Sequence, residues 1–182
     1  MNRETPTTEH LINLGRVLLQ SARQQLLATR TVQPCIFLID AMDGSPTNIL
    51  HFDPEKMGDN ASKQILSQEV NRLIQKHGFT TVVTLFDTYE MKFHPGKLRE
   101  GMALKLELGL SLKELAVAGF GTCKECAKLT VQTMVSCHEL TLTYQRNPED
   151  ATVTGFDEIT ERDLSKNESF IGRFRFFQEP GR

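Results

Sequence analysis

The chain lacks three features that would assign it to a common class of protein. No stretch approaches the roughly eighteen consecutive apolar residues of a membrane-spanning helix. Neither sign of charge dominates, because 21 basic residues stand against 23 acidic ones, whereas a protein that coats a duplex carries a basic excess. Four cysteines are too few and too unevenly spaced for the disulfide framework of a small secreted protein. The sequence therefore predicts no membrane span, disfavours nucleic acid as a partner and indicates a cytoplasmic location.

Signatures of catalysis and of protein targeting are also missing. The Gly-Phe-Gly of 119–121 lacks the lysine and the spacing of a phosphate-binding loop, and the chain contains neither a G-x-S-x-G nor an H-E-x-x-H motif. The five histidines are scattered and have no evident orienting partner. The first thirty residues lack the apolar core of a secretory signal. These absences favour a non-catalytic binding or regulatory protein.

What is present is the composition of a globular protein. Hydrophobic residues make up 39% of the chain and charged residues 24%, both ordinary values. A chain of 182 residues can bury about two-thirds of its unfolded surface. Because no repeat, low-complexity tract or linker divides it, we predict one α+β domain over residues 1–182. Within it, 1–6 is expected to be a disordered tail and 97–121 a helical insertion between sheet strands.

Two long helices are well marked. A threonine cap at position 7 or 8 begins a helix that runs to about Thr29, with apolar residues at helical spacing along one side. A second helix is capped by Asp59 or Asn60, and Gly78 ends it at the usual left-handed position. Each helix has an apolar stripe and therefore needs a partner surface.

Residues 97–118 fit two periods. Every fourth residue from Leu98 to Leu106 is apolar, as in a helix, while alternate leucines in the same stretch also fit a strand. We favour two short helices, because Ser111 and Glu114 have the spacing of a capping box at the start of the second one.

Most other apolar stretches are typical of short strands. An Asp43-Gly44 turn between two of them predicts a hairpin, and turn residues between the later ones predict an antiparallel meander. The strands are expected over 34–41, 47–52, 79–93, 127–136, 140–144, 151–159 and 170–177.

This order of elements favours the α+β class. We predict a mainly antiparallel sheet of about six to seven strands, with the N-terminal helix first, helices packed on one face and a β-meander at the C-terminus. The apolar faces of the best-marked elements should meet in one core. That core is expected to contain Leu18, Ile36, Leu38, Leu66, Leu73, Val83 and Leu85.

The densest set of potential metal ligands lies in 121–138. It comprises Cys123, Cys126, Cys137 and His138, and zinc prefers thiolate and imidazole ligands. A strand between Cys126 and Cys137 would separate them by about 36 Å, however, and no helix N-terminus is predicted that would activate Cys123 for redox chemistry. We therefore expect ordinary thiols, no bound zinc and no other cofactor, with a zinc-binding module at 121–138 as the alternative.

Four acidic residues form a second candidate site. Asp40 and Asp43 follow the first predicted strand, and Asp87 and Glu90 end the third. If these strands were adjacent and parallel, the carboxylates would meet at one end of the sheet and could hold Mg²⁺ for phosphodiester chemistry. Antiparallel pairing would place these carboxylates far apart and exclude a shared metal site. A small Mg-dependent phosphodiesterase or nuclease is therefore the catalytic alternative, although turn and solvent-exposed positions also explain these acids.

The last predicted strand is the candidate binding surface. Arg173 and Arg175 alternate there with phenylalanines, a pattern that can bind single-stranded nucleic acid but that a core face with an exposed arginine face explains equally well. A terminal strand also leaves a free sheet edge, on which proteins dock. We expect Arg173, Arg175 and Phe177 to bind a protein partner, with a helix face as the other docking surface. The identity of the partner and the formation of a homo-oligomer stay open.

Overall fold

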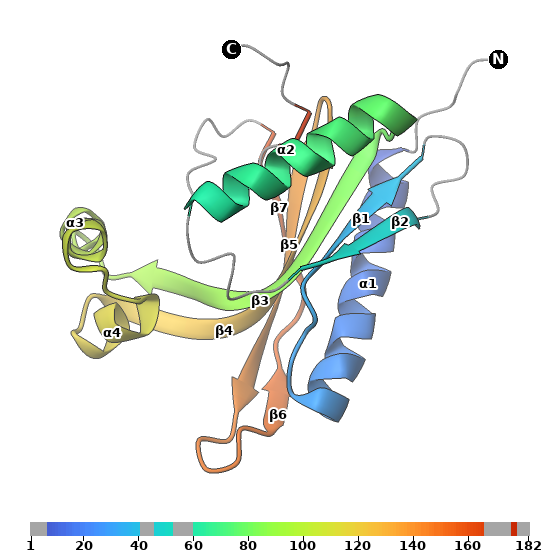
Figure 1. Cartoon of the computed structure of the whole chain (residues 1–182). Helices are drawn as coiled ribbons and strands as arrows, with labels where there is room; N and C mark the ends of the chain where they lie inside the picture. Colours follow the sequence, from blue (N-terminus) through green and yellow to red (C-terminus); the bar gives the residue numbers. More distant parts are fainter. Residues whose placement is uncertain (1–6, 41–45, 53–59, 166–175, 178–182) are drawn as a thin grey trace.

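The computed structural model describes residues 7–40, 46–52, 60–165 and 176–177, which form four helices and seven strands (Figure 1). The helices are α1 (Thr8–Thr29), α2 (Asn60–His77), α3 (Leu98–Leu108) and α4 (Leu112–Val117). The strands are β1 (Cys35–Ile39), β2 (Pro46–His51), β3 (Thr81–Phe93), β4 (Gly121–Thr133), β5 (Cys137–Arg146), β6 (Val153–Phe156) and β7 (Thr160–Asp163).

All seven strands belong to one antiparallel sheet. Their order is β2-β1-β3-β4-β5-β6, and β7 pairs with β5 on the side where β6 also pairs. The predicted α+β class, with the N-terminal helix first and strands at the C-terminal end, is confirmed. No helix within the described ranges is long and apolar enough to cross a membrane.

Helix α1 covers one face of the sheet, which we call the α1 face. Its first turn is capped by Thr7, whose Oγ1 accepts a hydrogen bond from the His10 N–H at 3.3 Å. Gly15 lets the helix backbone approach the sheet closely, because a Cβ there would lie 3.1 Å from Leu129 Cδ2. The side that faces β4 and β5 is buried at helical spacing, through Leu11, Gly15, Leu19, Ala22 and Leu26.

Helix α2 lies on the opposite face, the α2 face, so the expectation that helices pack on one face does not hold for it. Successive side chains of a strand point to opposite faces, and the two sides of β1 and β3 are therefore buried in different cores. Leu18, Val83 and Leu85 belong to the α1 core. The prediction of a single core is wrong, because the other four residues named for it, Ile36, Leu38, Leu66 and Leu73, belong to the α2 core.

The helical region between β3 and β4 has the predicted form. The Ser111 N–H donates to Glu114 Oε2 at 2.7 Å, and the Glu114 N–H donates to Ser111 Oγ at 3.2 Å, which completes the capping box. Gly109, at a φ of 67°, ends α3 in the left-handed conformation. We call residues 97–120 the helical arm. Figure 1 shows it at the far end of the long β3–β4 ribbon, away from α1 and α2.

Several predicted features fall partly or wholly outside the described residues. The hairpin of β1 and β2 is present, but its Asp43-Gly44 turn and the 1–6 tail lie outside those ranges. Of the expected 170–177 strand only Phe176 and Phe177 are described, and neither is in a strand. The pairing of β7 with β5 was not predicted.

Candidate functional site

The cysteines and the histidine of 121–138 are not brought together. Cys123 and Cys126 both lie in β4, where Cys126 pairs with Thr143 of β5. Cys137 begins β5 six residues earlier, about 20 Å along the strand, and His138 points to the opposite face from it. Across the described part of the chain, no group of three His, Cys, Asp or Glu side chains is placed to hold a metal ion. The geometry gives no support to the zinc alternative.

The Cys123-x-x-Cys126 pair is also not a redox pair. Residues three apart in a strand have side chains on opposite faces, and their Cα atoms are about 10 Å apart. A disulfide needs Cα atoms within about 7 Å. No disulfide joins the four cysteines, of which Cys123 is partly exposed and the other three are buried.

Thiol titration of the native protein should therefore count one fast-reacting cysteine, Cys123. Burial raises the pKa of Cys35 to about 11 and that of Cys126 to about 12, and the reactive species is the thiolate. Burial also raises the pKa of Cys123, but Cys123 alone is partly exposed to the reagent. The measurement is the reaction with Ellman's reagent before and after unfolding in guanidinium chloride. Cys123→Ser should abolish the fast phase. A second fast thiol, or a Cys123–Cys126 disulfide found by mass spectrometry after oxidation, would contradict this placement.

Of the four carboxylates proposed for Mg²⁺, the three within the described residues do not converge. Strands β1 and β3 are antiparallel, and the end of β1 pairs with the start of β3. Asp40, which follows β1, and Asp87, which lies late in β3, are therefore at opposite ends of this pairing. Asp43 lies outside the described residues. The parallel arrangement on which the catalytic alternative depended is absent.

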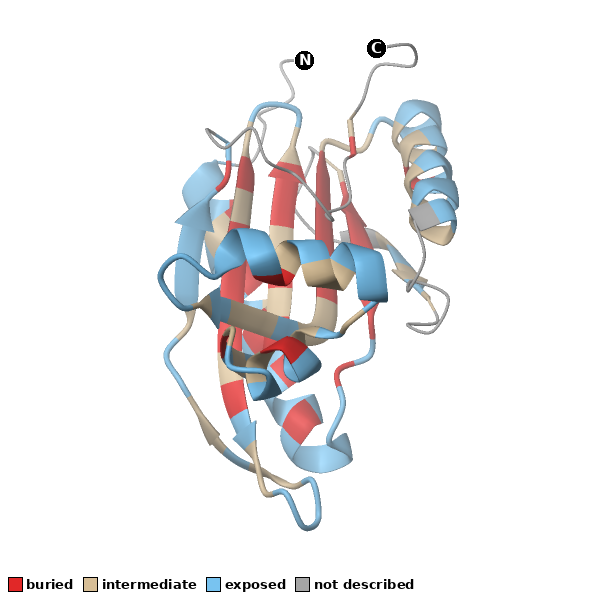
Figure 2. Ribbon diagram, turned by 90° about the vertical axis from the view of Figure 1, so that its left-hand side faces the viewer, coloured by how far each residue is buried: buried red, intermediate tan, exposed pale blue. Residues whose placement is uncertain are grey.

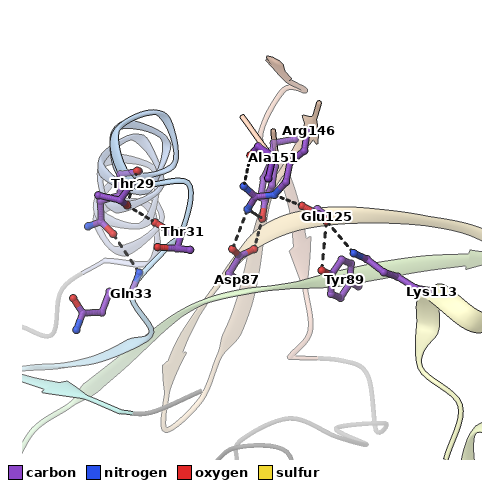
Figure 3. Close-up of polar contacts among 11 residues, drawn as sticks. Thr29, Thr31, Gln33, Asp87, Tyr89, Lys113, Glu125, Arg146 and Ala151 are labelled. Carbon is purple, nitrogen blue, oxygen red and sulfur yellow. Dashed lines mark hydrogen bonds and ion pairs between the residues drawn. The ribbon is translucent and has the colours of Figure 1, made fainter. Parts of the chain in front are cut away.

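Asp87 instead belongs to a polar network on the α1 face, formed by side chains of three strands. The Tyr144 hydroxyl donates a hydrogen bond to Asp87 Oδ1. Arg146 Nη2 lies 3.6 Å from Asp87 Oδ2, and Arg146 Nε donates to Glu125 Oε2. Figure 3 shows Asp87, Glu125 and Arg146 pointing toward one another from β3, β4 and β5. The network thus connects β3, β4 and β5 at the edge of the α1 core, to which Tyr144 itself belongs.

Lys113 of α4 joins this network to the helical arm. Its Nζ lies 3.3 Å from Glu125 Oε1 and 4.4 Å from the centroid of the Tyr89 ring. The Tyr89 hydroxyl donates to the same carboxylate at 3.4 Å (Figure 3). Glu125 therefore accepts from Arg146 on the sheet side and from Lys113 on the arm side. We call these residues the Glu125 network: Asp87, Tyr89, Lys113, Glu125, Tyr144 and Arg146.

The Glu125 network balances its own charges. Burial raises the pKa of Asp87, although Tyr144 and Arg146 act against this shift. Burial would also raise the pKa of Glu125, but the hydrogen bonds from Arg146 and Lys113 outweigh it and lower the pKa. The two carboxylates and the two cations neutralise one another. The contacts of Lys113 with Glu125 and Tyr89 attach the arm to the sheet.

Glu125→Gln should destabilise the protein at pH 7 by roughly 1–3 kcal/mol, because charge-assisted hydrogen bonds are lost. A lowered pKa means that the unfolded chain takes up the proton first as the pH falls. The ionised Glu125 carboxylate therefore contributes its full stabilisation at a pH above the ordinary glutamate pKa of 4.5. This contribution is lost as the pH falls below that value. Urea unfolding from pH 7 to pH 3 should show wild type and variant converging. Glu107→Gln, at an exposed carboxyl, is the control. A difference in stability between wild type and Glu125→Gln that stayed the same from pH 7 to pH 3 would contradict the role given to the Glu125 carboxylate.

A second polar cluster lies on the α2 face. Lys128 Nζ is 3.5 Å from Glu139 Oε1 and 3.8 Å from Glu90 Oε1, and Arg162 Nη2 is 3.5 Å from the same Glu90 oxygen. Glu139 is buried. These contacts join β3, β4, β5 and β7. Sequence reasoning missed both polar clusters, because a charged residue in a strand has an identifiable partner only when the pairing register is known.

The predicted partner-binding residues cannot all be placed. Arg173 and Arg175 lie outside the described residues. The Phe177 N–H donates to Asn71 Oδ1 of α2 at 3.0 Å, and its ring is half-buried against the α2 core. Phe177 therefore holds the chain against α2.

The helical arm carries the main group of exposed apolar side chains. Large hydrophobic residues are exposed at eleven of the described positions, and four of them belong to α3 and α4. Figure 2 shows buried positions concentrated in the central strands, whereas the arm is largely exposed. The exposed fractions are 58% for Leu98, 80% for Leu106, 67% for Leu108 and 91% for Val117.

Comparisons with protein-family models, with curated proteins and with solved structures found no match to this chain. The candidate functional site on the surface of this chain is the helical arm, which contacts the Glu125 network through Lys113.

Proposed function

We propose that this protein is a non-catalytic binding protein that engages a protein partner through its helical arm. The observation that carries the proposal is the exposure of Leu98, Leu106, Leu108 and Val117 in a segment of about twenty residues. Several large apolar side chains exposed within one short segment favour an interaction surface, because large exposed apolar patches mark interaction sites. No disulfide joins the four cysteines, as in proteins of the reducing cytoplasm, where we propose that the protein acts.

The arm is fixed in a way that suits binding. Leu115 of α4 is fully buried, and Gly101 of α3 packs so closely that a Cβ there would lie 2.6 Å from Phe93 Cε1 and 3.3 Å from Phe120 Cδ1. Lys113 adds its contacts with the Glu125 network. A surface that is already ordered loses less conformational entropy when a partner binds.

The sheet edge near the C-terminal end is the less favourable docking surface. Strand β7, which lies along β5, has the sequence Thr-Glu-Arg-Asp and is exposed at all four positions. Charged residues on an edge strand discourage pairing with another chain. The charged side chains of the two polar clusters pair with one another, which supports a binding role over catalysis.

Leu98→Ser/Leu106→Ser should weaken binding to the partner by at least about tenfold while leaving the fold intact, because both side chains are exposed. A photo-crosslinking residue at position 108 would capture the partner for identification. Calorimetry with the purified partner would then measure the affinity, and circular dichroism and thermal unfolding would check the fold.

The matched control is Val17→Ser/Ile65→Ser, which changes two equally exposed apolar residues on α1 and α2 and should leave the affinity unchanged. A partner that binds Leu98→Ser/Leu106→Ser as tightly as wild type would overturn the proposal.

A further inference from the structure

Helix α3 presents a narrow apolar ridge to solvent. Leu98, Met102 and Leu106 recur every fourth residue, so at 3.6 residues per turn they span an arc of only about 80°. Leu98 and Leu106 are exposed and Met102 is half-buried. One flank of the helix, about 100° around from the middle of the ridge, is anchored through Gly101 against Phe93 and Phe120.

One basic residue borders the ridge on each side. The same helical geometry places Arg99 about 20° beyond Leu106 and Lys105 about 20° before Leu98. Within the described residues neither cation is in an ion pair, whereas Lys97 is 2.9 Å from Glu100. We call Leu98, Arg99, Met102, Lys105 and Leu106 the α3 strip.

The acidic residues of α3 lie away from the strip. Glu100 and Glu107 fall about 140–160° around the helix from the middle of the ridge. The strip is therefore apolar at its centre and positively charged along both margins, although the whole chain has a net charge of −2.

We infer that the partner segment seated on α3 is an acidic amphipathic helix of another protein, an inference that rests on the proposed function. A ridge of residues four apart packs into the corresponding groove of a facing helix. Arg99 and Lys105, on the two sides of the ridge, then pair with acidic side chains that flank the apolar row of the partner helix, as in coiled coils. A membrane surface is the poorer fit, because a helix that lies in an interface carries Lys and Arg on its polar face, whereas the side of α3 away from the ridge carries Glu100 and Glu107.

The probe is a synthetic helical peptide of about twenty residues with leucines every fourth position, glutamates on both sides of that row and alanines elsewhere. The matched probe replaces the glutamates with lysines. Fluorescence anisotropy at about 50 mM salt should show that the acidic peptide binds the full chain at least about tenfold more tightly than the basic one. About 500 mM salt should remove most of this preference.

Arg99→Glu/Lys105→Glu should reverse the preference, so that the basic peptide binds better. The matched control is Arg72→Glu/Lys76→Glu, which makes the same change of charge at exposed positions of α2 and should keep the acidic preference. Vesicles of phosphatidylcholine with phosphatidylserine should bind neither wild type nor variants.

Equal affinity for the two peptides, no binding of the acidic one, or a preference for the anionic vesicles would overturn the inference. The proposed function has a separate test. If Leu98→Ser/Leu106→Ser abolishes binding of the crosslinked partner and Arg99→Glu/Lys105→Glu does not weaken it, the arm is the binding surface and the acidic helix is wrong. If neither pair weakens it, both proposals fail.

Discussion

Leu129→Ala should lower the free energy of unfolding by roughly 2–5 kcal/mol, the range for a fully buried leucine whose removal leaves a cavity. Leu129 is at the centre of the α1 core, with Leu85 and Leu140 opposite it on the neighbouring strands. Gly15 of α1 lies directly over it. Because the helix backbone is already close to the sheet, it has little room to move and fill the cavity.

Urea unfolding followed by circular dichroism measures this loss. Met134→Ala, at the exposed tip of the β4–β5 hairpin, is the control and should change the stability by no more than about 0.5 kcal/mol. If Leu129→Ala were as mild as Met134→Ala, α1 could not be packed on this face of the sheet.

Gly121→Ala should destabilise the far end of the β3–β4 ribbon and displace the helical arm. A Cβ at Gly121 would lie 2.3 Å from the Lys92 carbonyl oxygen and 2.8 Å from Phe93 Cα. Both are backbone atoms of the paired strand, so no side-chain rotation relieves the clash. We expect a loss of roughly 1–3 kcal/mol, together with weaker binding at the arm.

The control for this change is Gly155→Ala in β6, where a Cβ would meet no atom within 4 Å. Denaturant unfolding gives the stability, and amide hydrogen exchange over 90–121 reports on the ribbon and the arm. Identical behaviour of the two variants would show that β3 and β4 are not paired this closely at Gly121.

The sequence by itself determined the local features of this protein. Thr7 caps α1, Gly78 follows α2 at a φ of 74°, and Ser111 with Glu114 forms the capping box of α4. Each of these signals acts over three or four residues, so neighbouring side chains and backbone groups are enough to produce it. The same kind of local information placed most strands and, through their order, the α+β class.

Only the tertiary structure decided which of these side chains meet. Antiparallel pairing of β1 with β3 separated Asp40 from Asp87, and the pairing register of β4 with β5 brought Glu125 to Tyr144 and Arg146. The same register kept Cys126 far from Cys137. Strand direction and register depend on contacts between residues far apart in the chain, and a change of either moves every side chain to a different neighbour.

In the helical arm, too, the local sequence determined the helix and tertiary packing determined which of its faces is exposed. The spacing of Leu98 and Leu106 predicts an apolar stripe on a helix, and such a stripe ordinarily faces the core. In the folded chain α3 packs through Gly101 against Phe93 and Phe120, so the stripe stays in solvent. Periodicity specifies which side chains share a face of a helix, but the position of the helix on the rest of the molecule decides which face is covered.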